Sequence, residues 1–200
     1  MQEKIILASS SKYRAELLQR LHLEILVQAP AIDENKDIDD TPASWAEILS
    51  VRKAKAVAKQ HPDALVIGSD QVAEFNNQVI GKPGSRINAI NQLMAFSGAK
   101  VAFHTGVALV SNQRQILLSA LDTTWVHFRH LDRDEVAHYI DIEQPFDCAG
   151  SFKCESLGIS LFDRVVSDDP TALIGLPLIT LCGLLRRVGV DIPGSNCSAQ

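Results

Sequence analysis

The sequence lacks the patterns that mark membrane proteins, secreted proteins and common zinc or redox sites. No apolar stretch approaches the roughly 20 residues that cross a bilayer, and the N-terminal apolar run ends at Ala8, too early for the core of a signal peptide. No two of the four cysteines form a C-x-x-C pair, which excludes zinc-knuckle and thioredoxin-type motifs. We therefore expect a cytoplasmic protein, with no membrane partner, whose cysteines are reduced thiols.

Positive charge is also scarce. Lys and Arg number 19 against 24 Asp and Glu, which gives a formal net charge of −5. A general nucleic-acid binder needs a basic face that displaces counterions from the phosphate backbone. The charge balance therefore predicts no nucleic-acid partner, although it is compatible with a local basic site for a triphosphate.

Internal repeats, low-complexity tracts and long linkers are absent as well. In 200 residues, 46% hydrophobic and 22% charged side chains are typical of a globular unit with its own core. We predict a single domain in two lobes over residues 1–192. The small and polar residues 193–200 are predicted to form a disordered tail.

The hydrophobic periodicity predicts an α/β fold with a mixed sheet. Helical patterns alternate with strand patterns early in the chain, and hairpin signals such as Asn76-Asn77 dominate the middle, which favours a mixed sheet over a parallel one. Strands are predicted over 4–8, 24–28, 64–67, 71–75, 78–80, 100–104, 106–110 and 116–130. Helices are predicted over 12–22, 41–60, 86–96 and 132–142, with a last helical region that opens at Asp168-Asp169-Pro170.

The segment from Ile6 to Arg14 predicts a phosphate site. An apolar strand breaks into three serines and then opens a helix, whose first amides lack intrahelical partners and favour an anion. The hydroxyls of Ser9 and Ser11 would hold a terminal phosphate, and the Arg14 guanidinium would grip it as a fork. The alternative is a serine N-cap followed by a solvated surface arginine.

A second segment, Gly68-Ser69-Asp70-Gln71, places a carboxylate after an apolar strand. Ligands collect at the carboxyl edge of open α/β sheets, and a carboxylate at this edge can activate water directly or through a metal. Gly68 is predicted to let a ligand or another backbone come close. The alternative is an Asp that only begins a turn.

Two lysines and one glutamate extend this charge pattern. Lys53 lies at the edge of the apolar stripe of its helix, so it needs an anion unless it only snorkels along the core. Lys82, between Gly81 and Pro83, is presented by a tight turn, or is a solvated hairpin lysine. Glu34 belongs to an acidic loop and is a candidate magnesium ligand, or simply a solvated acid.

Taken together, these segments resemble the Maf-like nucleotide pyrophosphatases, and most closely the YceF branch. The resemblance covers the chain from Ile5 to about Val188 and rests on the order and spacing of short motifs. The motifs are LASSSKYR at 7–14, Asp33-Glu34, Lys53-Ala54, GSDQV at 68–72, GKP at 81–83, CAGSFKCE at 148–155 and DPTALIGLPL at 169–178. One departure is Lys12, which stands where the first motif of the family usually has proline.

The resemblance implies an elongated, two-lobed α/β enzyme with a central cleft, often a homodimer. Such an enzyme depends on a divalent cation, Mg or Mn, and cleaves a nucleoside triphosphate between the α and β phosphates. The functional positions of the family fall on Ser9, Arg14, Glu34, Lys53, Asp70 and Lys82, with Asp70 as the proton acceptor and Glu34 and Asp70 as the metal ligands. Ser11, in the same serine-rich segment as Ser9, is also predicted to bind the phosphate.

Three further positions of the family sort substrates, and here they are Tyr13, Gln71 and Glu155. This set resembles the branch whose implied substrate is 7-methyl-GTP. A cationic 7-methylguanine would be favoured by the Glu155 carboxylate and would stack on the face of Tyr13. Two alternatives remain open, namely a pyrophosphatase for UTP, dTTP or another modified purine nucleotide, and a non-catalytic nucleotide sensor that regulates cell division.

Overall fold

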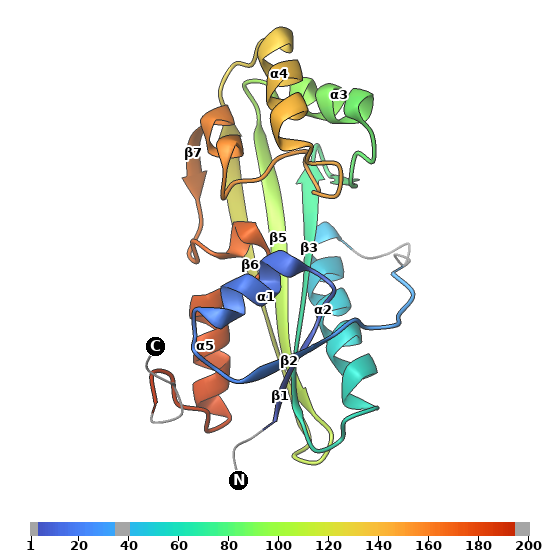
Figure 1. The fold of residues 1–200 in the computed structure, drawn as a ribbon, viewed down its shortest axis with the longest axis vertical. Coiled ribbons are helices and arrows are strands. Elements are labelled where there is room, and N and C mark those ends of the chain that lie inside the picture. The colour runs from blue at the N-terminus through green and yellow to red at the C-terminus, as the bar shows by residue number, and fades with distance from the viewer. Residues whose placement is uncertain (1–3, 35–40, 195–200) are drawn as a thin grey trace.

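The computed structural model describes residues 4–34 and 41–194, and it contains a seven-stranded mixed sheet (Figure 1). The strand order is β2-β1-β3-β5-β6-β7, and β4 pairs with β3 outside this path. β1 runs parallel to β2 and β3, whereas the other pairs are antiparallel, so the predicted mixed α/β sheet is confirmed. The strands are β1 Ile5–Ala8, β2 Ile25–Gln28, β3 Leu65–Phe75, β4 Gln78–Ile80, β5 Lys100–Ser111, β6 Ile116–Phe128 and β7 Phe162–Val166.

Five α-helices and two short 3-10 helices accompany the sheet in the described residues. They are α1 Lys12–Gln19, α2 Pro42–Ala58, α3 Arg86–Phe96, α4 Arg133–Glu143, α5 Leu178–Arg187, η1 Leu157–Leu161 and η2 Ala172–Ile174. Helices α1, α2 and α5 lie along one half of the long strands, and α3 and α4 lie at the other end (Figure 1). The molecule is therefore elongated and two-lobed, with β3, β5 and β6 passing through both lobes.

Alternation along β1 explains how the first lobe buries both faces of the sheet. Ile5 and Leu7 pack with leucines of α1 and α5, whereas Ile6 and Ala8 pack with alanines of α2 on the opposite face. Successive strand residues point to opposite faces, so a continuous apolar run suits a strand that is covered on both sides. This lobe positions the segment that follows β1.

The second lobe has a core rich in phenylalanine. Residues of β5, β6, α3 and α4 surround Phe103 and Phe152, whose ring centroids lie 5.2 Å apart with an edge-to-face orientation. Both rings also reach the wall of the cavity between the lobes. The core of this lobe therefore continues into one side of the candidate site.

The prediction that Asp70 follows the end of a strand was wrong. β3 is continuous from Leu65 to Phe75 because β5 pairs with it along this length, with Asp70 opposite Gly106. The predicted close approach at Gly68 is confirmed, since a Cβ atom there would lie 2.1 Å from the backbone oxygen of Ser50. Helix α2 can thus rest directly on β3, which brings Lys53 beside Asp70.

Other differences concern element ends. Helix α1 ends at Gln19 rather than residue 22, because His22 takes a positive φ of 51° as the chain turns toward β2. The two strands predicted over 100–104 and 106–110 form one strand, β5. Strand β7 and the two 3-10 helices were not predicted.

The last helix begins at Leu178, later than predicted from Asp168-Asp169-Pro170. Asp169 still caps it from a distance, because its Oδ2 accepts hydrogen bonds from the amides of Ile179 at 2.6 Å and Thr180 at 3.2 Å. The segment between Asp169 and α5 is thereby fixed as a loop that contains η2. Most of the tail predicted to be disordered, residues 195–200, lies outside the described residues.

Candidate active site

The cavity lies beside a stretch of β3 that has a neighbouring strand, β5, on only one of its two edges. On this side β1 ends at Ala8, opposite Gly68, and β4 begins to pair only at Ala73. Between these points the described residues place no strand against this edge of β3, and the lining of the cavity of about 620 Å³ includes the segments that follow β1 and β4 and part of β3 itself. Side chains from both faces of β3 can therefore reach the same space.

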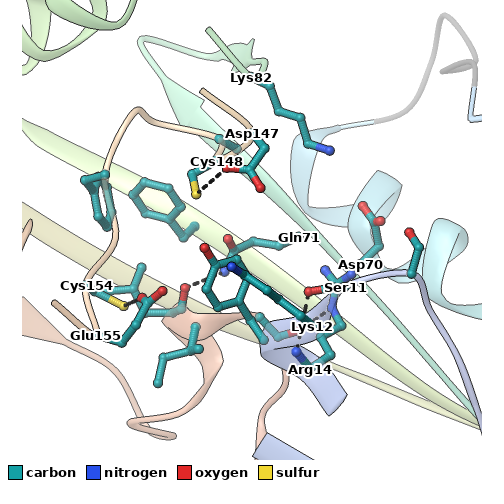
Figure 2. A pocket seen from close by; sticks show the side chains of 18 of the residues that line it. Ser11, Lys12, Arg14, Asp70, Gln71, Lys82, Asp147, Cys148, Cys154 and Glu155 are labelled. Carbon is teal, nitrogen blue, oxygen red and sulfur yellow. Dashed lines mark hydrogen bonds between the residues drawn. The ribbon is translucent and has the colours of Figure 1, made fainter. Parts of the chain in front are cut away.

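The structure brings almost all the predicted site residues to this cavity (Figure 2). Its lining includes Ser11, Tyr13, Arg14, Glu34, Lys53, Asp70, Gln71, Lys82 and Glu155. Ser9 is the exception, since it is buried behind the wall, where its Oγ accepts hydrogen bonds from the Ser11 amide at 3.1 Å and Arg14 Nη1 at 3.4 Å. Ser9 thus orients groups that line the cavity.

The start of α1 holds Arg14 in place. Ser11 is the N-cap of α1, and its Oγ accepts from the Arg14 amide at 3.4 Å, so the alternative assignment as a cap is confirmed for Ser11. The Arg14 side chain is not a free surface group, because its Nε donates to the carbonyl oxygen of Gly175 at 2.7 Å. Gly175 has a φ of 124°, which side-chain-bearing residues rarely adopt. Burial lowers the pKa of Arg14, and the carboxylates of Asp70 and Glu34 oppose this effect.

Lys53 joins two carboxylates. Its Nζ lies 2.8 Å from Glu34 Oε1 and also forms an ion pair with Asp70 Oδ1. The side chains of Lys53 and Asp70 are only 9% and 11% exposed, whereas that of Glu34 is 57% exposed. The prediction that Lys53 points inward against an anion is confirmed. Glu34, Lys53 and Asp70 together form an ionic centre in the wall of the cavity.

Lys82 enters the cavity wall from the segment after β4 (Figure 2). Its side chain is exposed and has no ion-pair or hydrogen-bond partner within the part of the chain that the structure describes. The lining has four cationic side chains from three separate segments, namely Lys82, Lys53, Arg14 and Lys12. Such a set suits a polyanion such as a triphosphate.

Another part of the lining is acidic. Glu155 and Asp147 lie near Tyr13, and burial together with Cys148 and these carboxylates raises the pKa of Tyr13 to about 12. The phenol therefore stays protonated at neutral pH. The ammonium of Lys12 lies 5.0 Å from the centroid of the Tyr13 ring, so this ring already has a cation over its face.

Gln71 lines the cavity from the face of β3 opposite to that of Asp70. Its Nε2 lies 3.1 Å from Thr105 Oγ1 and 3.0 Å from each of the backbone oxygens of Ala172 and Leu173. The loop that holds Arg14 through Gly175 therefore also holds Gln71. One loop thus fixes two side chains of the cavity.

Sequence reasoning missed several groups that line the cavity. Lys12 was noted only as a departure from the family motif, and Cys148 and Cys154 were predicted to be reduced thiols and were not assigned to a site. The rings of Phe103 and Phe152, the Asp147 carboxylate and the backbone of 173–175 were also missed. The motifs at 148–155 and 169–178 contain most of these residues and were the available signal.

The two thiols in the cavity wall are expected to react slowly. Burial, followed by the charges of Asp147 and Glu155 respectively, raises the pKa of both Cys148 and Cys154 to about 12. Since only thiolates are nucleophilic, alkylation by iodoacetamide at pH 8 should be on the order of a thousandfold slower than in the urea-unfolded chain. Timed peptide mass spectrometry measures both rates, and equal rates in the folded and unfolded protein would contradict this prediction.

The carboxylates of Glu34 and Asp70 are the groups best placed to hold a metal. Among residues 4–34 and 41–194, no group of three or more His, Cys, Asp or Glu side chains forms a metal site of its own. Magnesium needs no such group, because it uses one or two carboxylates together with substrate phosphates and water. The two carboxylates that meet at Lys53 are compatible with this ligand set.

In the described part of the chain, no helix has both the length and the apolar character needed to cross a bilayer.

Comparison with known proteins places this chain among close relatives. The sequence pattern of the Maf-like protein family matches residues 4–188. A protein of Xanthomonas oryzae pv. oryzae named 7-methyl-GTP pyrophosphatase is 51% identical over 96% of this chain and 100% of its own length. Proteins of the same name from Aromatoleum aromaticum and Colwellia psychrerythraea are 49% and 42% identical, covering 95% and 94% of this chain and 98% and 94% of their own lengths.

Among solved structures, a HAM1 protein from Coxiella burnetii is 20% identical, with a TM-score of 0.46 over 77% of this chain and 89% of that one. The sequence matches are far stronger, since the family pattern covers nearly the whole chain and the relatives are similar over their full lengths. The chain belongs to the Maf-like protein family.

Proposed function

We propose that this protein is a 7-methyl-GTP pyrophosphatase, which hydrolyses the nucleotide to 7-methyl-GMP and diphosphate. The observation that carries the proposal is the single cavity in which the Glu34–Lys53–Asp70 ionic centre, three further cations and an acidic region lie together. Relatives that are about 42–52% identical over nearly their full lengths have this activity in their names.

The chemistry requires water to attack phosphorus while the anionic oxygens are neutralised. The attack forms a new P–O bond, breaks the bond between phosphorus and the bridging oxygen, and releases one proton from the water. Asp70 is the carboxylate that accepts this proton, and Arg14, Lys53 and Lys82 neutralise the phosphate oxygens. The ion pair with Lys53 fixes the position of Asp70 before substrate binds.

Glu34 and Asp70 would hold the divalent cation, Mg or Mn. When bound, the cation would supply positive charge to the phosphate oxygens beyond that of the three cationic side chains. Glu34 is the more exposed of the two ligands, so it is the more accessible to a metal that arrives with the nucleotide. The requirement for a metal is tested directly by adding EDTA.

The acidic region explains why a methylated guanine would be favoured. Methylation at N7 gives the base a positive charge, whereas GTP, UTP and dTTP have neutral bases. Glu155 and Asp147 offer negative charge to such a cation, and the Tyr13 ring is a side chain of the same region on which a base can stack. A neutral base lacks the charge attraction to the two carboxylates.

The test is a diphosphate-release screen of the purified protein with 7-methyl-GTP, GTP, UTP and dTTP, with magnesium and with EDTA. We expect diphosphate only when the metal is present and the highest kcat/KM for 7-methyl-GTP. If 7-methyl-GTP had no advantage over GTP and UTP, the assignment of the substrate would be wrong. If no nucleotide released diphosphate, the proposal that the protein is a pyrophosphatase would be wrong.

Replacing Glu155 with Gln is expected to reduce the preference for 7-methyl-GTP over GTP. The loss of one carboxylate near a cationic base corresponds to about 1 kcal/mol, or about a fivefold lower ratio of kcat/KM for 7-methyl-GTP over GTP. Steady-state kinetics with both nucleotides measures this ratio. Glu24→Gln, the same change at an exposed residue outside the cavity, is the matched control and should leave the ratio unchanged.

A further inference from the structure

Lys82 is presented to the cavity of the candidate active site by an exposed piece of backbone (Figure 2). It belongs to residues 81–84, which lie between β4 and the N-cap of α3, and both Gly81 and Lys82 are exposed. A Cβ atom added at Gly81 would have no atom other than its chain neighbours within 4 Å in the described part of the chain. Side-chain packing therefore does not fix the backbone at this point, and the position of the Lys82 ammonium depends on hydrogen bonds.

Lys82 also lies in the wall of a second cavity. This cavity has a volume of about 370 Å³, and its lining includes the apolar side chains of Phe75, Ile80 and Phe96. The segment that presents Lys82 therefore borders two spaces. This is a further reason why hydrogen bonds, rather than contacts with neighbouring side chains, must determine where the ammonium lies.

Gln92 makes one of these hydrogen bonds. Its Nε2 donates to the backbone oxygen of Gly81 at 3.1 Å, and this oxygen belongs to the same planar peptide group as the Lys82 nitrogen. Gln92 is not among the residues that line the candidate active site, so it can influence a nucleotide only through another residue. It projects from a helix that is itself well anchored, because α3 buries Ala89, Ile90, Leu93 and Phe96.

Ser151 holds the other end of the Gln92 amide. Ser151 is fully buried, and its Oγ donates to Gln92 Oε1 at 2.5 Å. It has a φ of 64°, which residues other than glycine rarely adopt, so the surrounding structure must determine its conformation. Its amide donates to the backbone oxygen of Cys148 at 3.1 Å. Gln92 is therefore attached to a buried and well-defined part of the second lobe.

These two contacts fix the direction in which the amide points. A backbone oxygen can only accept a hydrogen bond, so the amide nitrogen must face Gly81, and the Ser151 hydroxyl is able to donate to the amide oxygen. The reverse orientation would place the Gln92 oxygen against the Gly81 oxygen and leave both without a donor. Ser151, Gln92 and Gly81 thus form a directed chain of hydrogen bonds that ends at the peptide group of Lys82.

We propose that Gln92 is a positioning residue that keeps the Lys82 ammonium within reach of the phosphate oxygens of a bound nucleotide. This inference rests on the proposed function, because it assumes that Lys82 binds these oxygens. Without the hydrogen bond from Gln92, the peptide group before Lys82 is free to reorient, and the ammonium is spread over the two spaces that it borders. Nucleotide binding must then order the ammonium, which costs conformational entropy and lowers affinity.

A second side chain of α3 supports the same segment. Asn88 Nδ2 donates to the backbone oxygen of Pro83 at 3.0 Å. Asn88 lies four residues before Gln92, so the two amides are neighbours on one face of the helix. Asn88 is exposed, and its side chain can therefore be replaced without disturbing a core.

The experiment is a double-mutant cycle in which calorimetry measures binding of the α,β-methylene analogue of 7-methyl-GTP in the presence of magnesium. Gln92→Met keeps the length of the side chain but removes both hydrogen bonds, and it should weaken binding by about tenfold. In a protein that already has Lys82→Ala, the same change should weaken binding by less than about twofold, because no ammonium is left to position. A merely structural role would weaken binding equally in both backgrounds.

Two further variants complete the test. Asn91→Leu changes the exposed neighbour of Gln92, which has no hydrogen-bond partner among the described residues, and as the matched control it should leave binding unchanged. Asn88→Leu should weaken binding by about threefold, again only when Lys82 is present, and it decides the question if Gln92→Met does not fold. The inference would be overturned if the folded variant left binding unchanged, or if its effect were the same with and without Lys82.

These outcomes are separate from the fate of the proposed function. Because the α,β-methylene bond is not hydrolysed, binding of the analogue reports the position of Lys82 without any turnover. A protein that shows the expected cycle but releases no diphosphate from any nucleotide would keep the inference and lose the proposed activity. A protein that releases diphosphate but shows equal effects in both backgrounds would keep the activity and lose the inference.

Discussion

Asp70→Asn is expected to lower kcat for nucleotide hydrolysis by about 10²–10⁴-fold, the usual contribution of a positioned proton acceptor. Asparagine fits the same space but cannot accept a proton from water at neutral pH. The loss should appear mainly in kcat, because Arg14, Lys53 and Lys82 remain to bind the phosphates. Diphosphate release at saturating nucleotide and saturating magnesium measures it, because the variant also loses one of the two carboxylates proposed to hold the metal.

The protein should stay folded in this variant. Lys53 keeps its ion pair with Glu34 at 2.8 Å, so no buried ammonium is left without a partner. Thermal unfolding of the variant checks this directly. Asp63→Asn, an isosteric change at an exposed residue in the turn before β3, provides the matched control for the loss of one carboxylate. Retention of full activity by Asp70→Asn would remove Asp70 from its proposed role.

Lys53→Met is expected to produce the second large effect, because it should lower kcat and also lower the magnesium concentration that the protein requires. The variant loses a cation beside the phosphates, so kcat should fall by about 10²–10³-fold. It also leaves Glu34 and Asp70 without the ammonium that joins them. Since less positive charge then opposes a metal ion, the magnesium concentration for half-maximal activity should fall by about tenfold.

Magnesium titrations of the residual activity measure both quantities. Lys55→Met lies on the same helix, two residues further on, and its side chain is exposed. It should change neither kcat nor the magnesium requirement. If Lys53→Met left the magnesium requirement unchanged, Glu34 and Asp70 would not be the ligands of the metal.

The local sequence predicted most elements because their signals are local. Asn76 and Asn77 take positive φ values of 53° and 62° at the predicted hairpin, and helix α3 has the predicted bounds, 86–96. The continuity of β3 could not be predicted in this way. It arises because β5, about 35 residues later, pairs with it through Gly68, Ser69 and Asp70.

The candidate site also has some features that the local sequence predicts and others that depend on distant segments of the chain. The inward position of Lys53 could be predicted, because a cation at the edge of an apolar stripe requires an anion. The identity of its two partners could not, since Glu34 and Asp70 come from separate segments. The loop at 172–175 was the least predictable part, because it acts through backbone carbonyls, whose positions depend on the fold rather than on side-chain type.

The short length of β1 has a consequence for how substrate preference can evolve in such a protein. Because β1 stops opposite Gly68, two consecutive residues of β3 serve one cavity from opposite sides of the sheet. In the mechanism proposed above, Asp70 acts in hydrolysis, whereas Gln71 lines the cavity from the other face of β3. Mutations at the second position can therefore reshape one side of the cavity while the carboxylate proposed to act in hydrolysis, and its ion pair with Lys53, are inherited unchanged.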